Sequence, residues 1–254
     1  MDRGDLLAAL LGLLLGLALR PRLGALWRAL RPRPRPDSVE QHQRAAQLRA
    51  LDGSARAGAP LVFYGDSLLH AFELSEWFPR AQAPLLNRAI AGDRTEHLAA
   101  RLEGSAPSAR AAFVLIGGND HLHAGVRRAP AEVARRVLEI AEQIPSEEPV
   151  RVVSLLPVAE PERAARISET NVLLSEQVGA RGLRYVDAHA ALASPEGRLP
   201  DALTYDGVHL RPAGMTVLAG VLAAACSSLG PPALNSGSAR VEYEGAPAEN
   251  RSAS

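Results

Sequence analysis

The chain has 254 residues, and its 28 basic residues balance its 28 acidic residues. This length is sufficient for one substantial hydrophobic core with tails, and the balanced charge gives no indication of nucleic acid as a partner. Every basic residue is an arginine, so the sequence excludes a Schiff-base lysine, a lysine general base and a Walker-type phosphate loop. The single cysteine, Cys226, excludes an intramolecular disulfide and leaves the redox compartment undecided.

The chain begins with an apolar segment. Residues 6–19 contain only Leu, Ala and Gly, and as a helix they span about 21 Å, less than the roughly 30 Å hydrocarbon core of a bilayer. Residues 23–30 place apolar side chains at helical spacing between arginines, which is typical of a helix at a lipid interface. Because residues 1–5 lack the net positive charge of a signal peptide, we expect an uncleaved membrane anchor.

A linker and a helix follow the apolar segment. Residues 31–36 alternate arginine and proline, which predicts a semi-rigid, extended spacer. A nucleic-acid-binding arm is the alternative, and the absence of interleaved aromatic residues disfavours it. Residues 38–51 have the pattern of an amphipathic helix, and residues 53–58 have that of a loop.

From residue 61 the chain alternates between strand and helix patterns. The predicted strands are residues 61–64, 85–90, 111–116, 150–156 and 183–186, and the predicted helices are residues 68–78, 95–102, 130–144, 162–180 and 212–227. Apolar strands separated by helices indicate a parallel sheet that is covered on both faces. After residue 230 the composition turns to Pro, Gly, Ser, Ala and Glu, which predicts a disordered tail.

Ser67 stands at the turn between the first strand and the helix after it, in Gly65-Asp66-Ser67-Leu68. Its backbone N–H belongs to the first turn of a helix and has no intrahelical partner, so it can stabilise an anion. We therefore expect Ser67 to be a nucleophile. No Gly-x-Ser-x-Gly surrounds it, which argues against the elbow of the α/β hydrolases.

Two further strand ends supply groups that can stabilise an oxyanion. Asn119 follows the third predicted strand, and its side-chain amide can donate to a developing oxyanion. Gly92 follows the second strand, permits a close approach of the backbone and offers an N–H donor. Sites in open α/β sheets lie beyond the carboxyl ends of the strands, so we expect these groups to meet Ser67 at one edge.

Asp206 and His209 supply the expected base. Their Asp-x-x-His spacing lets one turn present both side chains, so that Asp206 fixes the imidazole tautomer and His209 faces Ser67. An ordinary loop histidine is the alternative for His209 taken alone.

Several charged residues flank these positions. We expect Asp66, Asp93 and Asp120 to hold turns through hydrogen bonds to the backbone rather than to transfer protons. Arg94 closely follows Gly92, and its position allows two interpretations. Either Arg94 binds an anionic group of the substrate, or it pairs with Asp93 or Glu96.

Four sequence blocks lie around Ser67, Gly92, Asn119 and His209. In this order they resemble the blocks of the SGNH (GDSL) hydrolase family, which is named for its Ser, Gly, Asn and His. Ser67 matches the nucleophile of the family, Gly92 and Asn119 match its oxyanion donors together with the Ser67 N–H, and Asp206 with His209 matches its base pair. The block around Gly92 is especially similar to bacterial thioesterase/lysophospholipase members and to relatives of platelet-activating-factor acetylhydrolase. Family members often have a glycine a few residues after the serine, and this chain has none there.

The resemblance covers residues 60–225 and implies a flavodoxin-like, three-layer α/β/α sandwich with a five-stranded parallel sheet. The expected organisation is an anchor and Arg-Pro linker at 1–36, a helix and loop at 37–58, the hydrolase domain at 59–229 and a disordered tail at 230–254. Arginines follow the apolar segment, which favours a cytoplasmic position for that side. Anchored relatives often work outside the cytoplasm, so both the cell envelope and the cytoplasmic face stay open.

The expected activity is hydrolysis of an ester or thioester of a lipid-like or small acyl substrate through an acyl-enzyme, with no metal and no organic cofactor. The expected partners are this substrate and a membrane, without nucleic acid, and the oligomeric state is left open. A carbohydrate O-deacetylase and an O-acetyltransferase on the same fold are the alternatives. A non-catalytic binding module is less favoured, because such a module has no physical need for an Asp–His pair beside a serine.

Overall fold

The structure, a computed structural model, describes residues 38–52, 58–103, 106–122 and 128–233. The expected anchor and linker at 1–36 and the tail from residue 234 onward lie outside these residues, so membrane attachment stays a prediction. Within the described ranges, no helix combines the length and the apolar character needed to cross a bilayer.

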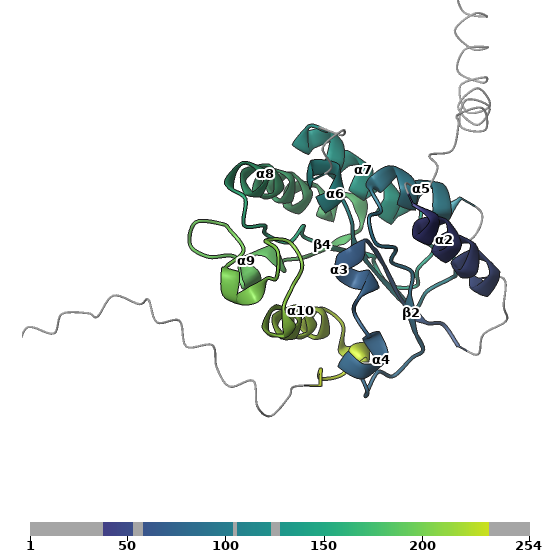
Figure 1. Ribbon diagram of the computed structural model, residues 1–254. Helices are drawn as coiled ribbons and strands as arrows, with labels where there is room; N and C mark the ends of the chain where they lie inside the picture. Colours follow the sequence, from purple (N-terminus) through teal and green to yellow (C-terminus); the bar gives the residue numbers. More distant parts are fainter. Residues whose placement is uncertain (1–37, 53–57, 104–105, 123–127, 234–254) are drawn as a thin grey trace, which may run out of the picture. The chain divides into compact units, whose positions relative to one another are not determined.

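A five-stranded parallel sheet forms the centre of the fold (Figure 1). Its strands are β1 (Leu61–Gly65), β2 (Leu85–Asn87), β3 (Ala111–Leu115), β4 (Arg151–Val153) and β5 (Arg184–Val186), in the order β2-β1-β3-β4-β5. Phe63 pairs with Asn87 on one side and with Phe113 on the other. This order is that of flavodoxin-like sheets, whose direction of winding reverses between β1 and β3. The predicted fold class is confirmed.

Strand β2 ends three residues earlier than predicted. The backbone N–H groups of Arg88 and Ile90 still donate to carbonyls of β1, at 2.7 and 3.0 Å. The Asn87 side chain, however, accepts from the Ala89 N–H at 3.0 Å. This local bond turns the chain away from the ladder, as asparagine side chains do at turns.

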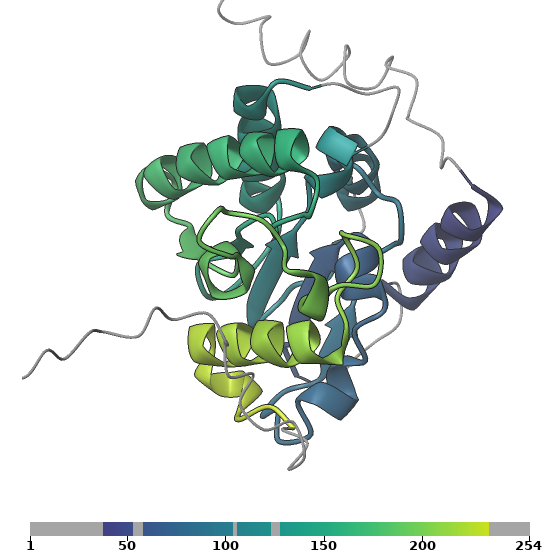
Figure 2. The same cartoon turned by 60° about the vertical axis from the view of Figure 1, so that its left-hand side comes forward.

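Helices cover both faces of the sheet (Figures 1 and 2). They are α2 (Val39–Asp52), α3 (Ser67–His70), α4 (Leu74–Trp77), α5 (Thr95–Leu102), α6 (Gly118–Leu122), α7 (Pro130–Glu142), α8 (Pro161–Gln177), α9 (His189–Leu192) and α10 (Pro212–Ala225). The five helices predicted at 38–51, 95–102, 130–144, 162–180 and 212–227 form within a few residues of the expected bounds. The short helices α6 and α9 were not predicted.

The single helix predicted at residues 68–78 is wrong, because the chain forms α3 and α4 with a break between them. The Asn87 side-chain amide donates to the carbonyls of Leu69 and Phe72 at 2.8 and 3.2 Å. These bonds replace the backbone donors that a continuous helix would supply to those carbonyls. A side chain from the next strand thus ends α3 just after the serine.

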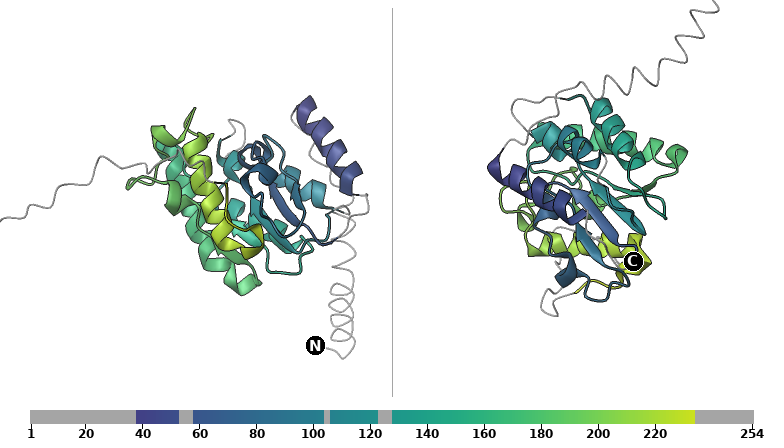
Figure 3. Two further views of the ribbon diagram at one scale, coloured as in Figure 1. Left: turned by 90° about the horizontal axis from the view of Figure 1, so that it is seen from below. Right: turned by 90° about the vertical axis from the view of Figure 1, so that its right-hand side faces the viewer.

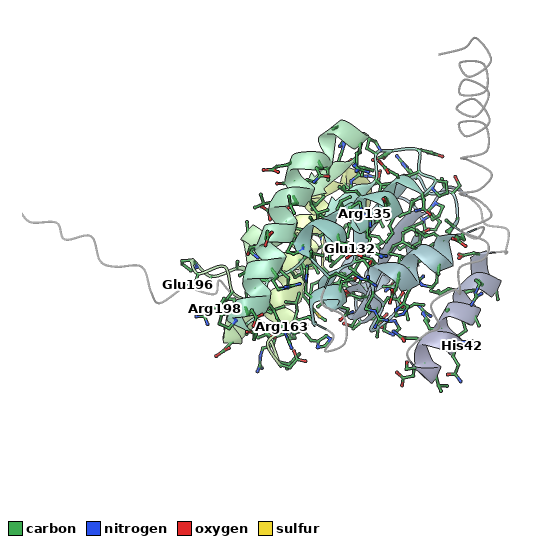
Figure 4. The ribbon with its side chains drawn as sticks, turned by 90° about the horizontal axis from the view of Figure 1, so that it is seen from above. His42, Glu132, Arg135, Arg163, Glu196 and Arg198 are labelled. Atoms are coloured by element: carbon green, nitrogen blue, oxygen red, sulfur yellow. The ribbon has the colours of Figure 1, made fainter. Side chains whose placement is uncertain are left out.

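The two faces of the sheet bury separate hydrophobic clusters. On one face Phe63 stacks on Phe113 with ring centroids 4.7 Å apart, under α9 and α10. On the other face the apolar sides of α5, α7 and α8 cover β1, β3 and β4. Helix α7 is amphipathic: Val137 is fully buried, whereas Glu132 and Arg135 lie on its outer side (Figure 4). These two layers therefore cover the sheet on both faces.

Helix α2 packs against the loop that follows the edge strand β2 (Figure 3). Ala45 and Leu48 of α2 form a small buried cluster with Ile90. Arg88 donates to Asp52 at 2.7 Å, and both side chains are largely buried. The helix is therefore docked on the loop that follows β2. The domain boundary at residue 59 stays a prediction, although these contacts attach α2 to the sheet.

Candidate active site

Ser67 is the first residue of α3, directly beyond the carboxyl end of β1. Asp66 caps this helix by accepting from the Leu68 N–H at 3.1 Å. Gly65 permits the turn, because a Cβ at this position would lie 2.6 Å from the Leu115 carbonyl oxygen of β3. The neighbouring strand leaves no room for a side chain there, so the chain turns tightly into the serine.

Ser67, His209 and Asp206 form one hydrogen-bonded chain. The Ser67 hydroxyl oxygen lies 3.0 Å from His209 Nε2, and His209 Nδ1 lies 2.7 Å from Asp206 Oδ2. If Nδ1 carries the proton, it donates to Asp206, and Nε2 is then free to accept from Ser67. The fold thus brings together Ser67 and His209, which are 142 positions apart in the sequence. The three side chains follow one another in the order that serine activation requires.

The loop that carries the histidine holds the carboxylate in place. Asp206 Oδ1 accepts from the backbone N–H groups of Val208 and His209 at 3.0 and 2.8 Å. The hydrogen bonds to His209 and to the backbone lower the pKa of Asp206 to about 2. Thr204 closes the turn by donating to the His209 carbonyl at 2.9 Å and accepting from the Gly207 N–H at 2.9 Å. Asp206 is therefore ionised throughout the neutral range, and its orientation is set by the backbone.

The predicted oxyanion donors come from three strand ends. Gly92 has φ of +78°, in the left-handed region that glycine adopts readily. Its N–H donates to no other residue in the part of the chain that the structure describes. Asn119 lies on α6, just beyond β3, and its Nδ2 donates to the Asp93 carbonyl at 2.9 Å. An amide nitrogen carries two hydrogens, so this bond orients Asn119 and leaves one hydrogen for a ligand.

The flanking aspartates are structural: Asp66 and Asp120 accept backbone hydrogen bonds as expected, whereas Asp93 does not. Asp93 accepts from the guanidinium of Arg101 at 2.6 Å, with an ion pair in place of the expected backbone bond. Asp120 is fully buried and accepts from the backbone and the hydroxyl of Thr95, at 2.9 and 2.7 Å. These bonds tie α6 to α5 and so fix the helix that carries Asn119.

Two further charged groups, Arg94 and Asp66, lie close to the site. Arg94 donates to Glu96 at 2.7 Å, which is one of the two interpretations of its sequence position. Burial raises the pKa of Asp66 to about 7, and the bond from the Leu68 N–H opposes this shift only in part. The pKa of this buried carboxyl beside the nucleophile is therefore well above that of an exposed aspartate.

A small pocket opens beside the serine. Ser67 and Asn119 line it, together with a wall of apolar residues that includes Leu68, Leu155, Leu156, Val158, Ile167 and Val208. Its volume is about 20 Å³, and on this measure a cavity of roughly 10–15 Å³ holds one water molecule. The pocket thus accommodates a group of only one or two heavy atoms next to the hydroxyl. In the described residues, no group of three or more His, Cys, Asp or Glu side chains is placed to hold a metal ion.

Two residues that contribute to this site could not be predicted from the sequence. The sequence does not show that Asn87 ends α3, because that contact depends on the position of β2 beside the helix. Nor does it show that Gln41 of α2 lies against the Gly92 loop, where its side chain donates to the Ala91 carbonyl at 3.0 Å. The Ser-x-x-Gln signal at residues 38–41 predicts a helix start but carries no information on what the helix contacts.

The comparisons with known proteins agree with this geometry. The family model described as GDSL-like lipase/acylhydrolase matches residues 63–217, more than half of the chain. No curated protein sequence matches the chain.

Solved structures show the same fold. A protein from Streptococcus pneumonia, provisionally described as a platelet activating factor, has 24% identity and a TM-score of 0.64, over 83% of this chain and 98% of that one. A GDSL-like lipase from Bacteroides thetaiotaomicron has 18% identity and a TM-score of 0.60, over 74% and 98%. Est24, a carbohydrate acetylesterase from Sinorhizobium meliloti, has 15% identity and a TM-score of 0.52, over 68% and 100%.

Proposed function

The chain belongs to the GDSL-like lipase/acylhydrolase family and is a serine ester hydrolase, and from this premise we propose that it removes short acyl groups through an acyl-enzyme on Ser67. The observation that carries the proposal is the hydrogen-bonded chain from Asp206 through His209 to Ser67, at the mouth of a small apolar pocket. We assign each of these residues its role in the reaction as part of the same proposal.

In the first half of the reaction His209 Nε2 takes the proton of the Ser67 hydroxyl while the oxygen attacks the acyl carbonyl. The carbonyl oxygen becomes an oxyanion, which the N–H groups of Ser67 and Gly92 and the amide of Asn119 stabilise. The ionised Asp206 stabilises the imidazolium. His209 then gives its proton to the leaving oxygen or sulfur, the bond to the leaving group breaks, and the acyl-enzyme remains.

In the second half water replaces the leaving group. His209 takes a proton from the water as it attacks the acyl carbonyl, and the same donors hold the second oxyanion. The bond to Ser67 breaks, the serine regains its proton from His209, and the carboxylic acid leaves. The side chains of His209 and Asp206 are about half exposed, at 49% and 53%, so water reaches the base without a conformational change.

The size of the pocket supports a short acyl group. A volume of about 20 Å³ holds the methyl of an acetyl group, and the packed wall leaves no enclosed space for a long chain. Accessibility of the base to water favours hydrolysis over transfer to a second acceptor, so the O-acetyltransferase is the weaker alternative. A non-catalytic module is disfavoured because the complete hydrogen-bonded chain is present.

A carbohydrate O-deacetylase is a second candidate, because it differs only in the leaving group. The leaving-group side is open to solvent, and Tyr205, next to Asp206, is 64% exposed. The guanidinium of Arg211 lies 4.8 Å from the centre of the Tyr205 ring. An exposed aromatic ring beside the base offers a surface on which a sugar ring can stack. The S. meliloti neighbour is a carbohydrate acetylesterase, which agrees with this candidate.

The proposal is tested by hydrolysis of p-nitrophenyl esters from acetate to decanoate with the full chain. We expect the highest kcat/KM with acetate, a steep fall beyond butyrate, and loss of the rate in Ser67→Ala. Ser175→Ala, the same substitution at an exposed position of α8, is the matched control and keeps the rate. A maximum with long chains refutes the short-acyl assignment. A rate that persists in Ser67→Ala refutes the nucleophile.

A further inference from the structure

Helix α2 lies outside the residues that the family model matches, 63–217, yet it contacts the loop that carries an oxyanion donor. We propose that Gln41 of α2 is a positioning residue, which holds the Ala91–Gly92 peptide so that its N–H meets the oxyanion. This inference rests on the proposed function, in which the Gly92 N–H is one of the oxyanion donors.

The first observation is that the Gln41 side chain is held at both ends. It is 5% exposed, and its Nε2 donates to the Ala91 carbonyl at 3.0 Å. Its Oε1 accepts from the Ser38 N–H at 3.1 Å, and the Gln41 N–H donates to the Ser38 hydroxyl at 3.2 Å. This reciprocal pair is a capping box at the start of α2. With Oε1 used by the cap, the amide presents its donor to the glycine loop.

The second observation concerns the peptide that Gln41 contacts. A trans peptide is planar, and its carbonyl and N–H point in opposite directions. The Ala91 carbonyl and the Gly92 N–H belong to the same peptide, so a donor that fixes the carbonyl also fixes the direction of the N–H. A hydrogen bond to the carbonyl polarises the peptide and strengthens the N–H as a donor. Gln41 therefore acts on the oxyanion donor without approaching the substrate.

The third observation is the closeness of the helix to the glycine. A Cβ at Gly92 would lie 2.8 Å from Gln41 Nε2, so a side chain at position 92 would displace the Gln41 amide from its present position. The remainder of the loop is also tied down: the Ile90 N–H donates to Gly65 at 3.0 Å, and the Asp93 N–H donates to Ile90 at 3.2 Å. Between these bonds, the contact from Gln41 orients the Ala91–Gly92 peptide.

Two substitutions separate positioning from simple docking of the helix. Gln41→Glu keeps the cap acceptor, and a carboxylate at a helix start is favourable, but it turns an oxygen toward the Ala91 carbonyl. Gln41→Met is close in size and removes both the cap acceptor and the donor. A docking role predicts that the methionine variant is the more impaired, because it loses the cap. The positioning role predicts that the glutamate variant is the more impaired, because its carboxylate repels the carbonyl.

The experiment measures kcat and KM for p-nitrophenyl acetate, and Tm, with the full chain. Loss of one oxyanion donor costs roughly 10²–10³-fold in turnover, so for a misdirected donor we expect kcat to fall about 10- to 100-fold in Gln41→Glu. KM stays within about twofold. Tm falls, because the new carboxylate lies at a largely buried position, so kcat is measured well below the Tm of each variant. Gln47→Glu, the same substitution at an exposed position of α2, is the matched control and leaves kcat unchanged.

A second readout follows the oxyanion directly. A p-nitrophenyl phosphonate reacts with the serine and places a phosphoryl oxygen where the oxyanion forms. Its rate of inactivation falls in Gln41→Glu by the same factor as kcat/KM. Weaker binding of the ground-state ester alone would instead raise KM and leave kcat unchanged.

The outcomes are distinguishable from failure of the proposed function. If Ser67→Ala removes activity and Gln41→Glu keeps the wild-type kcat, the positioning inference is overturned and the nucleophile stands. If Gln41→Met is more impaired than Gln41→Glu, with a matching fall in Tm, Gln41 serves helix docking and the inference is again overturned. If Ser67→Ala keeps its activity, the proposed function itself fails.

Discussion

Replacing Asp206 with asparagine changes the histidine tautomer while leaving the size of the side chain nearly unchanged. Asp206 Oδ1 accepts from two backbone N–H groups, at 3.0 and 2.8 Å. In Asp206→Asn the amide oxygen takes this position. The reverse orientation would place the NH₂ group against the two backbone N–H donors, and it would cost about 1–3 kcal/mol for each hydrogen bond that is broken. The NH₂ group then faces His209 Nδ1, where the carboxylate oxygen lay at 2.7 Å.

A donor at that position forces the proton of His209 onto Nε2. Nε2 lies 3.0 Å from the Ser67 hydroxyl and can no longer accept its proton. The corresponding change in a serine protease lowers kcat roughly 10⁴-fold. Because Asp206 and His209 are about half exposed here, water partly substitutes, and we expect a fall of about 10³- to 10⁴-fold. This corresponds to roughly 4–5.5 kcal/mol in the activation free energy.

The assay is kcat for p-nitrophenyl acetate together with Tm. Asp201→Asn, the same substitution at an exposed position, is the control and keeps the wild-type rate. Because the carboxylate is not buried, Tm is expected to change little in either variant. A kcat above one tenth of the wild-type value in Asp206→Asn, with Tm unchanged, would refute the reasoning that Asp206 sets the tautomer of His209.

Three further predictions concern the oxyanion donor, the buried carboxyl and the core. Asn119→Ala lowers kcat roughly 10²–10³-fold with little change in Tm, and an unchanged kcat in steady-state assays would contradict its role. Burial raises the pKa of Asp66 to about 7 from an ordinary value of 3.8, so its contribution to stability falls as the pH rises from about 4 to 7. Asp66→Asn keeps the cap acceptor. The free energy of unfolding of this variant, minus that of the wild type, rises by on the order of 2 kcal/mol from pH 5.5 to pH 8. If urea denaturation gives the same difference at both pH values, this prediction is wrong. Phe113 is fully buried and stacked on Phe63, so Phe113→Ala lowers the free energy of unfolding by about 3–5 kcal/mol in the same assay, and a loss below about 1 kcal/mol would contradict the packing argument.

The expected site residues were predictable because each stands at a recognisable local position. Ser67 and Asn119 directly follow apolar strands, and Asp206 and His209 share one turn. The carboxyl ends of parallel strands meet at one edge of a sheet, so adjacency to a strand end translates into proximity in space. This relation needs no knowledge of side-chain contacts, and Ser67 and Asn119 line the same pocket in agreement with it.

Contacts between segments were less predictable. A continuous helix is expected at residues 68–78 from the pattern alone, and the structure has a break there because Asn87 takes carbonyls of the first turns. Helix propensity is a weak prior that a single tertiary contact can override. The expected backbone bond of Asp93 is likewise replaced by its pair with Arg101, eight residues along the chain.

The fold class, the alternation of strands and helices, and the residues at the strand ends can be predicted from the sequence alone, because they depend on local pattern and on the rules of parallel sheets. The contact of Gln41 with the Gly92 loop depends instead on tertiary packing, since Gln43 and Gln47 of the same helix are exposed. The three glutamines are chemically identical along the chain. What distinguishes them is the face of α2 that docks on Ile90, and that face is set by packing between segments some 50 residues apart.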